Sequence, residues 1–372
     1  MEPIRILYIN GGIMDRGGIS TYMMNYYRNM DRSKIQIDFV VHGFEKGSFD
    51  DEIRSMGGII YNIPVKSKNY LGNINELRKI FNSGKYKIVH SHMDAMGYIA
   101  LKEAKKTGIP IRIAHSHSTR HMTTNKIKYI LNEYARSKIT KYATHFFSCS
   151  NEAGKWLYGD KLIDNVKIIH NAIDLDKFSY NESKQNNIIP QVNLNDNIVF
   201  GHVGHFNYIK NHDFLIDLFK EINEMEENVL LMLVGDGEYR EDIYNKVKRL
   251  GLSNKVLFLG IRKDISSIMN VMDVFILPSI FEGLPVVGIE AQAKSLQCFI
   301  SDSVTNEIAI TDNVTFLSLN SSAKEWANII ISKLKLLKKQ DMTQQITEAG
   351  YNIKLEAEKL ADLYISMHKK EV

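Results

Sequence analysis

Short apolar runs alternate with longer amphipathic stretches along almost the whole 372-residue chain. The runs Ile4–Ile9 and Ile35–Val41 are typical of buried strands, and the segment between them, near Ile19–Met30, is typical of a helix. Alternation of this kind indicates β-α-β units, which build parallel sheets covered by helices. It therefore predicts an α/β fold.

The polar, asparagine-rich segment Ser179–Asn187 interrupts the alternation, which begins again at Ile198–Val203. A chain of this length usually holds two domains. We expect two Rossmann-like domains facing a central cleft, the N-terminal one over residues 1–185 and the C-terminal one over residues 190–350. Residues 351–372 are expected to form a C-terminal helix that could return to the N-terminal domain. Ligands of such sheets bind beyond the carboxyl ends of the strands.

The bulk composition excludes several classes of protein. A net charge of +4 is too small to indicate nucleic-acid binding. No apolar stretch approaches the length of a membrane span, and the N-terminus lacks a signal-peptide pattern. Cys149 and Cys298 lie in separate apolar segments and are expected to be buried thiols in a reducing compartment. These features predict a cytoplasmic protein.

The segment Lys126–Lys141 is basic and rich in aliphatic and tyrosine residues. A helix of this composition can lie on an anionic membrane surface. We therefore consider peripheral contact with the inner face of the membrane through this segment. An ordinary amphipathic helix packed on the sheet is the alternative, and it stays open at this point.

The most informative motif is Ser279–Glu290, which follows the apolar run Val274–Leu277. A helix is expected to open near Pro285, since proline is tolerated where the helical N–H groups are unbonded. Glu282 then precedes the helix and Glu290 lies inside it. Helix N-termini bind anions, so the pattern suits a diphosphate that carries hydroxyl groups, such as a nucleotide sugar. An ordinary helix start with nearby acidic residues is the alternative.

Two further loops follow predicted strands. The loop Gly11–Gly18 would let backbone N–H groups approach a phosphate or sugar, although a tight turn is the alternative. It matches neither the dinucleotide fingerprint nor the ATPase fingerprint. The loop Gly201–His212 carries His205 and Lys210, which can both face phosphate oxygens. A solvated polar loop is the alternative there.

Two short motifs raise the question of a metal. His115 and His117 end another predicted strand, but no third histidine or carboxylate lies at a suitable local spacing. A histidine that contacts the ligand is therefore preferred, and His117 is nearer the strand end. Asp174-Leu175-Asp176 matches a metal-binding tripeptide of some sugar transferases, yet its place beside the linker favours a cap or a turn. No metal site is expected.

Together these motifs resemble the GT-B retaining glycosyltransferases of family 4, the glycosyl transferases group 1, and within them the exopolysaccharide and capsule branch. The most specific element is the E-x7-E motif, which Glu282 and Glu290 match within Phe-Glu-Gly-Leu-Pro. The glycines of the first loop, Asn171–Asp174 and Val234–Gly237 also fit in order and spacing. The resemblance covers nearly the whole chain.

The resemblance implies a role for each matching position. Glu290 would hold the ribose diol, Glu282 would bind donor-sugar hydroxyls, and Lys210 would neutralise the diphosphate. The family usually has arginine where this chain has His205, so stabilisation there would be weaker, pH-dependent or left to Lys210. His117 would contact the transferred sugar. The remaining expected donor contacts are Gly17, Gly18, Gly204, Asn207, Gly235, Arg262, Phe281, Gly283 and Leu284.

The implied activity is metal-independent, cofactor-free transfer of a hexose from a nucleotide sugar, with retention of configuration. UDP is favoured but not fixed, and the acceptor is expected to be a saccharide or a lipid-linked saccharide in bacterial surface polysaccharide synthesis. A front-side displacement fits, in which catalysis is positioning and charge stabilisation. A nucleotide-sugar 2-epimerase of the same architecture and a non-catalytic nucleotide-sugar-binding protein are the alternatives. No nucleic-acid partner is expected.

Overall fold

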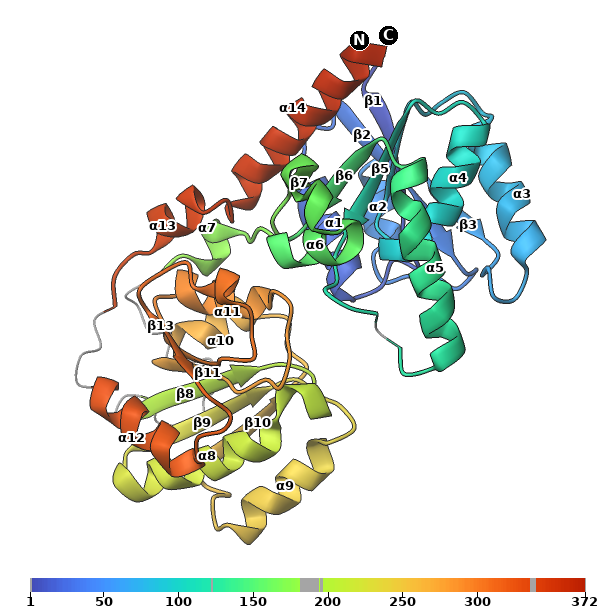
Figure 1. Ribbon diagram of the computed structural model, residues 1–372. Helices are drawn as coiled ribbons and strands as arrows, with labels where there is room; N and C mark the ends of the chain where they lie inside the picture. The colour runs from blue at the N-terminus through green and yellow to red at the C-terminus, as the bar shows by residue number, and fades with distance from the viewer. Residues whose placement is uncertain (1, 122, 181–193, 195–196, 335–338, 372) are drawn as a thin grey trace. The chain divides into compact units, whose positions relative to one another are not determined.

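The structure is a computed structural model that describes residues 2–121, 123–180, 194, 197–334 and 339–371. The chain divides into two compact units, residues 1–172 with 352–372 and residues 173–351 (Figure 1). Each unit contains one parallel sheet with helices around it, which confirms the predicted pair of Rossmann-like α/β halves. The first unit ends at Ala172, ahead of the predicted linker, of which residues 181–187 lie outside the described part.

The first unit contains a seven-stranded parallel sheet in the order β3-β2-β1-β4-β5-β6-β7. Its strands are β1 (Ile4–Ile9), β2 (Ile35–His42), β3 (Ile60–Ile63), β4 (Ile88–Ser91), β5 (Ile111–Ser116), β6 (His145–Ser148) and β7 (Val166–Ile168). Its helices are α1 (Gly18–Asn29), α2 (Asp50–Ser55), α3 (Tyr70–Phe81), α4 (Tyr98–Lys106), α5 (Lys126–Tyr142), α6 (Asn151–Tyr158) and α14 (Ile353–Glu371). Strand β7 lies at the edge of the sheet, where Val166 to Ile168 pair with β6.

The second unit contains a six-stranded parallel sheet in the order β10-β9-β8-β11-β12-β13. Its strands are β8 (Ile198–Val203), β9 (Val229–Val234), β10 (Val256–Gly260), β11 (Val274–Leu277), β12 (Gln297–Ser301) and β13 (Val314–Leu317). Its helices are α7 (Leu175–Phe178), α8 (His212–Met225), α9 (Arg240–Arg249), α10 (Ile265–Asn270), α11 (Val286–Ala293), α12 (Ala323–Leu334) and α13 (Thr343–Glu348).

Both faces of each sheet are covered by hydrophobic packing. In β9, Leu230 and Met232 belong to one apolar cluster, while Leu231 and Leu233 belong to another. Successive side chains of a strand point to opposite faces, so the two clusters are the two faces of the sheet. In the first unit α14 completes one of them, because Leu360 and Tyr364 pack into the cluster that contains α1. The last helix thus belongs to the first unit.

The environment of three other features follows from this architecture. Cys149 and Cys298 are buried, as predicted, and neither forms a disulfide in the described part of the chain. No helix in the described part of the chain is both long enough and apolar enough to cross a membrane. Asp174 precedes the short helix α7 and pairs with Lys177 at 2.6 Å, so this acidic tripeptide starts a helix.

Candidate donor-binding site

The second sheet reverses its winding direction between β8 and β11, which are hydrogen-bonded neighbours. The chain leaves β8 toward β9 on one side and reaches β12 from β11 on the other. The connections that follow β8 and β11 therefore run toward opposite edges of the sheet, and open α/β sheets bind ligands at such a point. These two loops carry Lys210 and Glu282, the residues that the sequence singled out.

Hydrogen bonds tie the two loops together. The Ile280 N–H donates to the Ile209 carbonyl oxygen at 2.8 Å, and the Asn211 side chain donates to the Pro278 carbonyl oxygen at 3.1 Å. Asn211 has a left-handed backbone with φ of 54°, a conformation that asparagine tolerates better than most residues. Its side chain thus fixes the loop after β8 to the end of β11.

An ion pair joins the two predicted site residues within this framework. The Lys210 ammonium lies 2.5 Å from Glu282 Oε1, and the two side chains are only 14% and 17% exposed. Ser279 Oγ donates to the same carboxylate oxygen at 2.9 Å. The Asn207 side chain accepts a hydrogen bond from the Lys210 N–H at 3.1 Å. The side chain of Asn207 therefore shapes the turn that presents the lysine.

Glu290 lies on α11, the helix that begins directly after Pro285. Its carboxyl group is partly buried, and burial alone raises its pKa to about 7. Desolvation disfavours the charged form of a carboxyl group, and no nearby cation offsets that effect among the causes of the shift. A carboxyl group held in this state is a candidate for binding hydroxyl groups.

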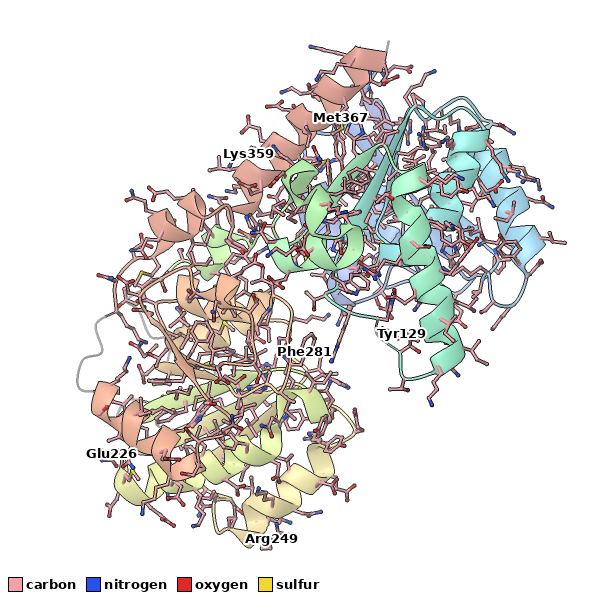
Figure 2. The ribbon with its side chains drawn as sticks, in the orientation of Figure 1. Tyr129, Glu226, Arg249, Phe281, Lys359 and Met367 are labelled. Atoms are coloured by element: carbon pink, nitrogen blue, oxygen red, sulfur yellow. The ribbon has the colours of Figure 1, made fainter. Side chains whose placement is uncertain are left out.

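The residues next to Glu282 are divided between surface and core. Phe281 and Gly283 are partly exposed, whereas Leu284 packs against the apolar cluster of this unit. Figure 2 labels Phe281 in this loop. Glu282 itself forms an isolated parallel bridge with Val304, which follows β12. The backbone of the motif is thus anchored on both sides of the carboxylate.

Two predicted donor residues, Gly204 and Gly235, have a structural reason to be glycine. A Cβ at Gly235 would lie 2.0 Å from the Gly204 carbonyl oxygen, and the φ of Gly235 is +136°. A Cβ at Gly204 would lie 2.9 Å from Lys210 Cε. These contacts bring the ends of β8 and β9 together beneath the lysine, so the glycines support the site by close packing.

His205 and Arg262 lie at the surface. The His205 side chain is 62% exposed and faces Glu238 at 3.2 Å, while the Arg262 guanidinium forms a fork with Asp264 at 2.8 and 2.6 Å. The Asp264 carboxylate raises the pKa of Arg262. The structure therefore brings Lys210 and Glu282 into contact and gives His205 and Arg262 other partners.

The first unit carries the predicted glycine loop after β1. Gly17 precedes α1, and a Cβ at either Gly17 or Gly18 would meet no atom within 4 Å. Neither glycine has a positive φ. The fold around this helix start therefore has room for a side chain at both positions, unlike the fold around Gly235.

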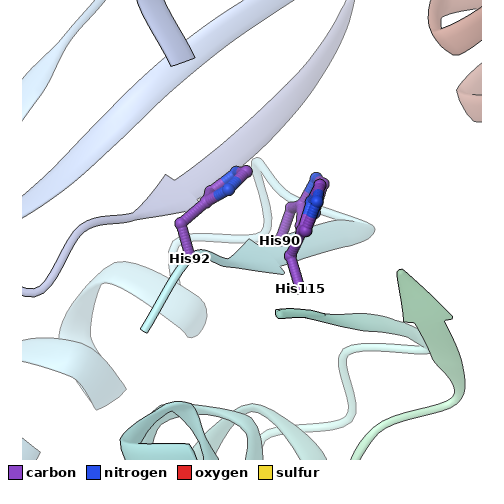
Figure 3. A group of neighbouring side chains, drawn as sticks. All are labelled: His90, His92 and His115. Atoms are coloured by element: carbon purple, nitrogen blue, oxygen red, sulfur yellow. The ribbon is translucent and has the colours of Figure 1, made fainter. Parts of the chain in front are cut away.

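Four histidines form a packed layer at the ends of β4 and β5, and only His115 and His117 among them were singled out from the sequence. His90 and His92 pair with His115 and His117 across the strands, because two His-x-His segments lie at the ends of neighbouring parallel strands. Figure 3 shows His90, His92 and His115. The sequence argument considered local spacing around His115 only, so it did not include His90 and His92, which lie beside His115 in space. One ring nitrogen each of His90, His92 and His115 lies within 4.8 Å of the other two.

His117 has a defined environment in this layer. Its Nε2 lies 2.9 Å from His92 Nδ1, and its backbone N–H donates to the Asp94 carboxylate at 2.6 Å. Burial lowers the pKa of His117 to about 3, so the ring is neutral at pH 7. The ring of Tyr22, from the helix that Gly18 begins, lies 4.9 Å from it. His117 and the glycine loop thus belong to one packed region of the first unit.

Two surface features of the first unit were not fully foreseen. A groove of about 830 Å³ is lined by residues of several loops, among them Ile13, His42, Phe44, Pro64 and Lys68. On α5, Ala135 and Ile139 are buried, but the first half of the helix exposes apolar side chains. These are Ile127, Tyr129, Ile130, Leu131 and Tyr134, of which Tyr129 is labelled in Figure 2.

Two protein-family models match this chain, one over most of each unit. Residues 16–177 match the model of Glycosyltransferase Family 4, and residues 184–353 match that of Glycosyl transferases group 1. EpsF of Bacillus subtilis is 35% identical over 370 residues, covering 97% of this chain and 96% of EpsF. The UDP-Gal:α-D-GlcNAc-diphosphoundecaprenol α-1,3-galactosyltransferase of Escherichia coli is 27% identical and covers 86% of this chain and 85% of that enzyme.

Solved structures show the same fold. Anabaena HepE in complex with UDP-glucose superposes with a TM-score of 0.71 at 19% identity, covering 99% of this chain and all of HepE. A glycosyltransferase from Rickettsia africae superposes with a TM-score of 0.78 at 18% identity, with coverage of 99% and 100%. At this level of identity the agreement concerns the fold alone.

Proposed function

The chain belongs to the group 1 glycosyltransferases of family 4, and from this premise we propose that it transfers a hexose from a UDP-sugar to a saccharide acceptor with retention of configuration. The contact between Lys210 and Glu282 carries the proposal. A diphosphate needs a cation, a sugar needs hydroxyl acceptors, and both groups lie at one sheet switch point.

In the proposed reaction Lys210 binds the diphosphate, which leaves as the acceptor hydroxyl attacks the anomeric carbon from the same face. The leaving phosphate oxygen accepts the proton of that hydroxyl. Glu282 binds sugar hydroxyls, Glu290 binds the ribose diol, and the amides of Gly283 and Leu284 face the diphosphate. His117 contacts the transferred sugar and Gly17 and Gly18 approach the diphosphate, as the family resemblance implies. Rate enhancement then comes from positioning and from charge stabilisation.

Because Lys210 already pairs with Glu282, we infer that donor binding separates them and assigns each a ligand group. Lys210→Met should lower kcat about 10²–10³-fold, the cost of removing one preorganised stabilising group. Glu282→Gln, which keeps the size of the side chain, should weaken discrimination between donor sugars. Lys220→Met is the control, because that lysine lies on α8 and pairs with Glu224. Normal turnover by Lys210→Met would refute the role of the lysine.

We propose that no divalent ion bridges the diphosphate. Calorimetric binding of UDP should then give the same affinity in EDTA and in Mg²⁺, whereas Mg²⁺-dependent binding would contradict this point. Incubation with donor alone separates the transferase from the two alternatives. An isomerised sugar nucleotide would indicate an epimerase, and complete inertness toward donor with every acceptor tested would indicate a binding protein.

We further propose that the acceptor is lipid-linked and that α5 contacts the membrane surface. The E. coli relative acts on a diphosphoundecaprenol-linked sugar, as its name states. Exposed apolar side chains lie on the first half of α5, and lysines flank them. Such a helix inserts its apolar side chains at the interface, while the lysines attract anionic lipids.

Vesicle co-sedimentation tests this contact. Reversing the charge of Lys126, Lys128 and Lys138 to glutamate should lower partitioning onto anionic vesicles at least tenfold, since each basic residue contributes about 1 kcal/mol. Lys248→Glu, on α9 of the second unit, is the control. Unchanged binding of the triple variant would contradict the contact.

The groove lined by Phe44 could hold the acceptor saccharide. If it does, Phe44→Ala should raise the acceptor KM and leave the donor KM unchanged.

A further inference from the structure

The four histidines at the ends of β4 and β5 form two hydrogen-bonded pairs stacked on each other. Within one pair His90 Nε2 lies 3.0 Å from His115 Nδ1, and within the other His92 Nδ1 lies 2.9 Å from His117 Nε2. The ring centroids of His90 and His92 lie 4.1 Å apart with their planes tilted by 31°, and those of His115 and His117 are stacked 4.2 Å apart. Three of the side chains, those of His90, His92 and His115, are fully buried.

Two of these buried rings have a nitrogen without a hydrogen-bond partner in the described part of the chain. These atoms are His92 Nε2 and His115 Nε2, and both are buried. An orphaned polar atom in an interior costs about 1–3 kcal/mol, so two of them in one layer indicate a missing partner. The other nitrogen of each ring is already engaged, by His117 and His90 respectively.

The hydrogen bonds at the Nδ1 atoms of His92 and His115 determine whether their Nε2 atoms need a donor or an acceptor as partner. If the Nδ1–H groups of His92 and His115 donate to the neighbouring rings, both unpartnered Nε2 atoms carry free lone pairs. His90 differs, because its Nδ1 lies 2.6 Å from the hydroxyl of Tyr364 and its Nε2 accepts the hydrogen bond of His115, so it offers a lone pair only when that bond opens. Metal-binding histidines usually have the second nitrogen fixed by such a hydrogen bond.

The chemistry of the layer favours a transition metal over other cations. All three histidines are fully buried, and burial disfavours the charged imidazolium relative to the neutral imidazole, which is the ligating form. Neutral imidazole suits zinc, copper, nickel and cobalt, whereas calcium and magnesium require oxygen ligands. Three imidazoles with an open fourth position are a known arrangement for zinc.

We propose that His90, His92 and His115 bind one divalent transition-metal ion of the zinc class. Figure 3 shows that the three rings project to the same side of the two strands. Binding at 2.0–2.1 Å from each nitrogen requires the ligand atoms to move closer and the His90–His115 hydrogen bond to open. The ion would link the ends of β4 and β5 and hold His92, which in turn orients His117.

Metal analysis of the full chain without a polyhistidine tag tests the proposal. After saturation with Zn²⁺ and removal of free ion, we expect one equivalent per chain. Co²⁺ should give the absorption spectrum of a nitrogen-ligated site. His92→Gln and His115→Gln should each lower the bound metal at least tenfold. His145→Gln is the matched control, since His145 begins the adjacent strand β6 and lies outside the layer.

Circular dichroism and gel filtration establish that each variant is folded. A Tm that rises with Zn²⁺ in wild type and control, but not in the other two variants, supports the site. The absence of bound metal in the folded wild type overturns the proposal and leaves an ordered water as the partner of the two nitrogens. Equal metal content in all four proteins also overturns it, because the ion would then lie elsewhere. None of these readouts depends on transferase activity.

Discussion

The raised pKa of Glu290 makes the stability of the second unit depend on pH. Its folded pKa is about 7, against 4.5 for an ordinary glutamate. The folded state therefore favours the protonated carboxyl, so the associated stability is fully present below pH 4.5 and is lost as pH rises through 7. A shift of this size corresponds to about 3 kcal/mol at 1.36 kcal/mol per unit. Partial exposure reduces this to about 1–3 kcal/mol.

Glu290→Gln removes the titrating group but keeps the shape and hydrogen-bonding capacity of the protonated side chain. We expect the variant to match wild type at pH 4.5 and to be more stable at pH 8 by about 1–3 kcal/mol. In a unit of this size each kcal/mol changes Tm by about 2–4 °C. Thermal unfolding of both proteins from pH 4.5 to 8 measures the difference, and the exposed Glu227→Gln is the control.

Donor affinity should change in the opposite direction. If the ionised carboxylate binds the ribose diol, UDP affinity of wild type falls as pH drops through 7, while Glu290→Gln binds weakly at every pH. The variant would thus gain stability and lose affinity at pH 8. A variant that unfolds at the wild-type temperature across the whole pH range would refute the argument from burial. Unchanged UDP affinity would refute the proposed role in binding.

Two further predictions concern the loops at the ends of β8 and β9. Gly235→Ala should destabilise the fold by more than about 3 kcal/mol, because the new Cβ would lie 2.0 Å from a backbone oxygen. In Gly251→Ala the new Cβ would meet no atom within 4 Å, so this control should cost only about 1–2 kcal/mol for its positive φ. Urea unfolding of the two variants measures the difference. If His205 donates a hydrogen bond to the diphosphate, His205→Ala should lower turnover. Turnover equal to that of wild type would remove His205 from the mechanism.

Much of the fold was predictable because its signals are local. Strands β1, β8 and β11 have the predicted bounds, since each is an apolar run with clear ends. The family assignment was also predictable, because the glutamate motif lies within twelve consecutive residues. The contact between Lys210 and Glu282 was only implied, since it depends on β8 and β11 being neighbours.

The histidine layer was missed because it depends on strand order. His90 and His115 are 25 positions apart, and no local pattern connects them. They become neighbours because β4 pairs with β5 in a register that sets His90 beside Ile113 and Ser91 beside Ala114. A second His-x-His at the end of the preceding predicted strand was the available signal, since adjacent strands of a parallel sheet end at the same edge.

The glycines of the two units show what sequence alone could not separate. Gly17, Gly18, Gly204 and Gly235 all follow strands and all match the family pattern, so the sequence assigns them one role. The structure gives Gly235 a steric reason within the fold, while Gly17 and Gly18 have open space and ordinary backbone angles. A ligand that approaches the start of α1 closely would need the open space at these two positions. A diphosphate at a helix N-terminus has that requirement, which makes this helix start the first unit's strongest candidate for donor contact.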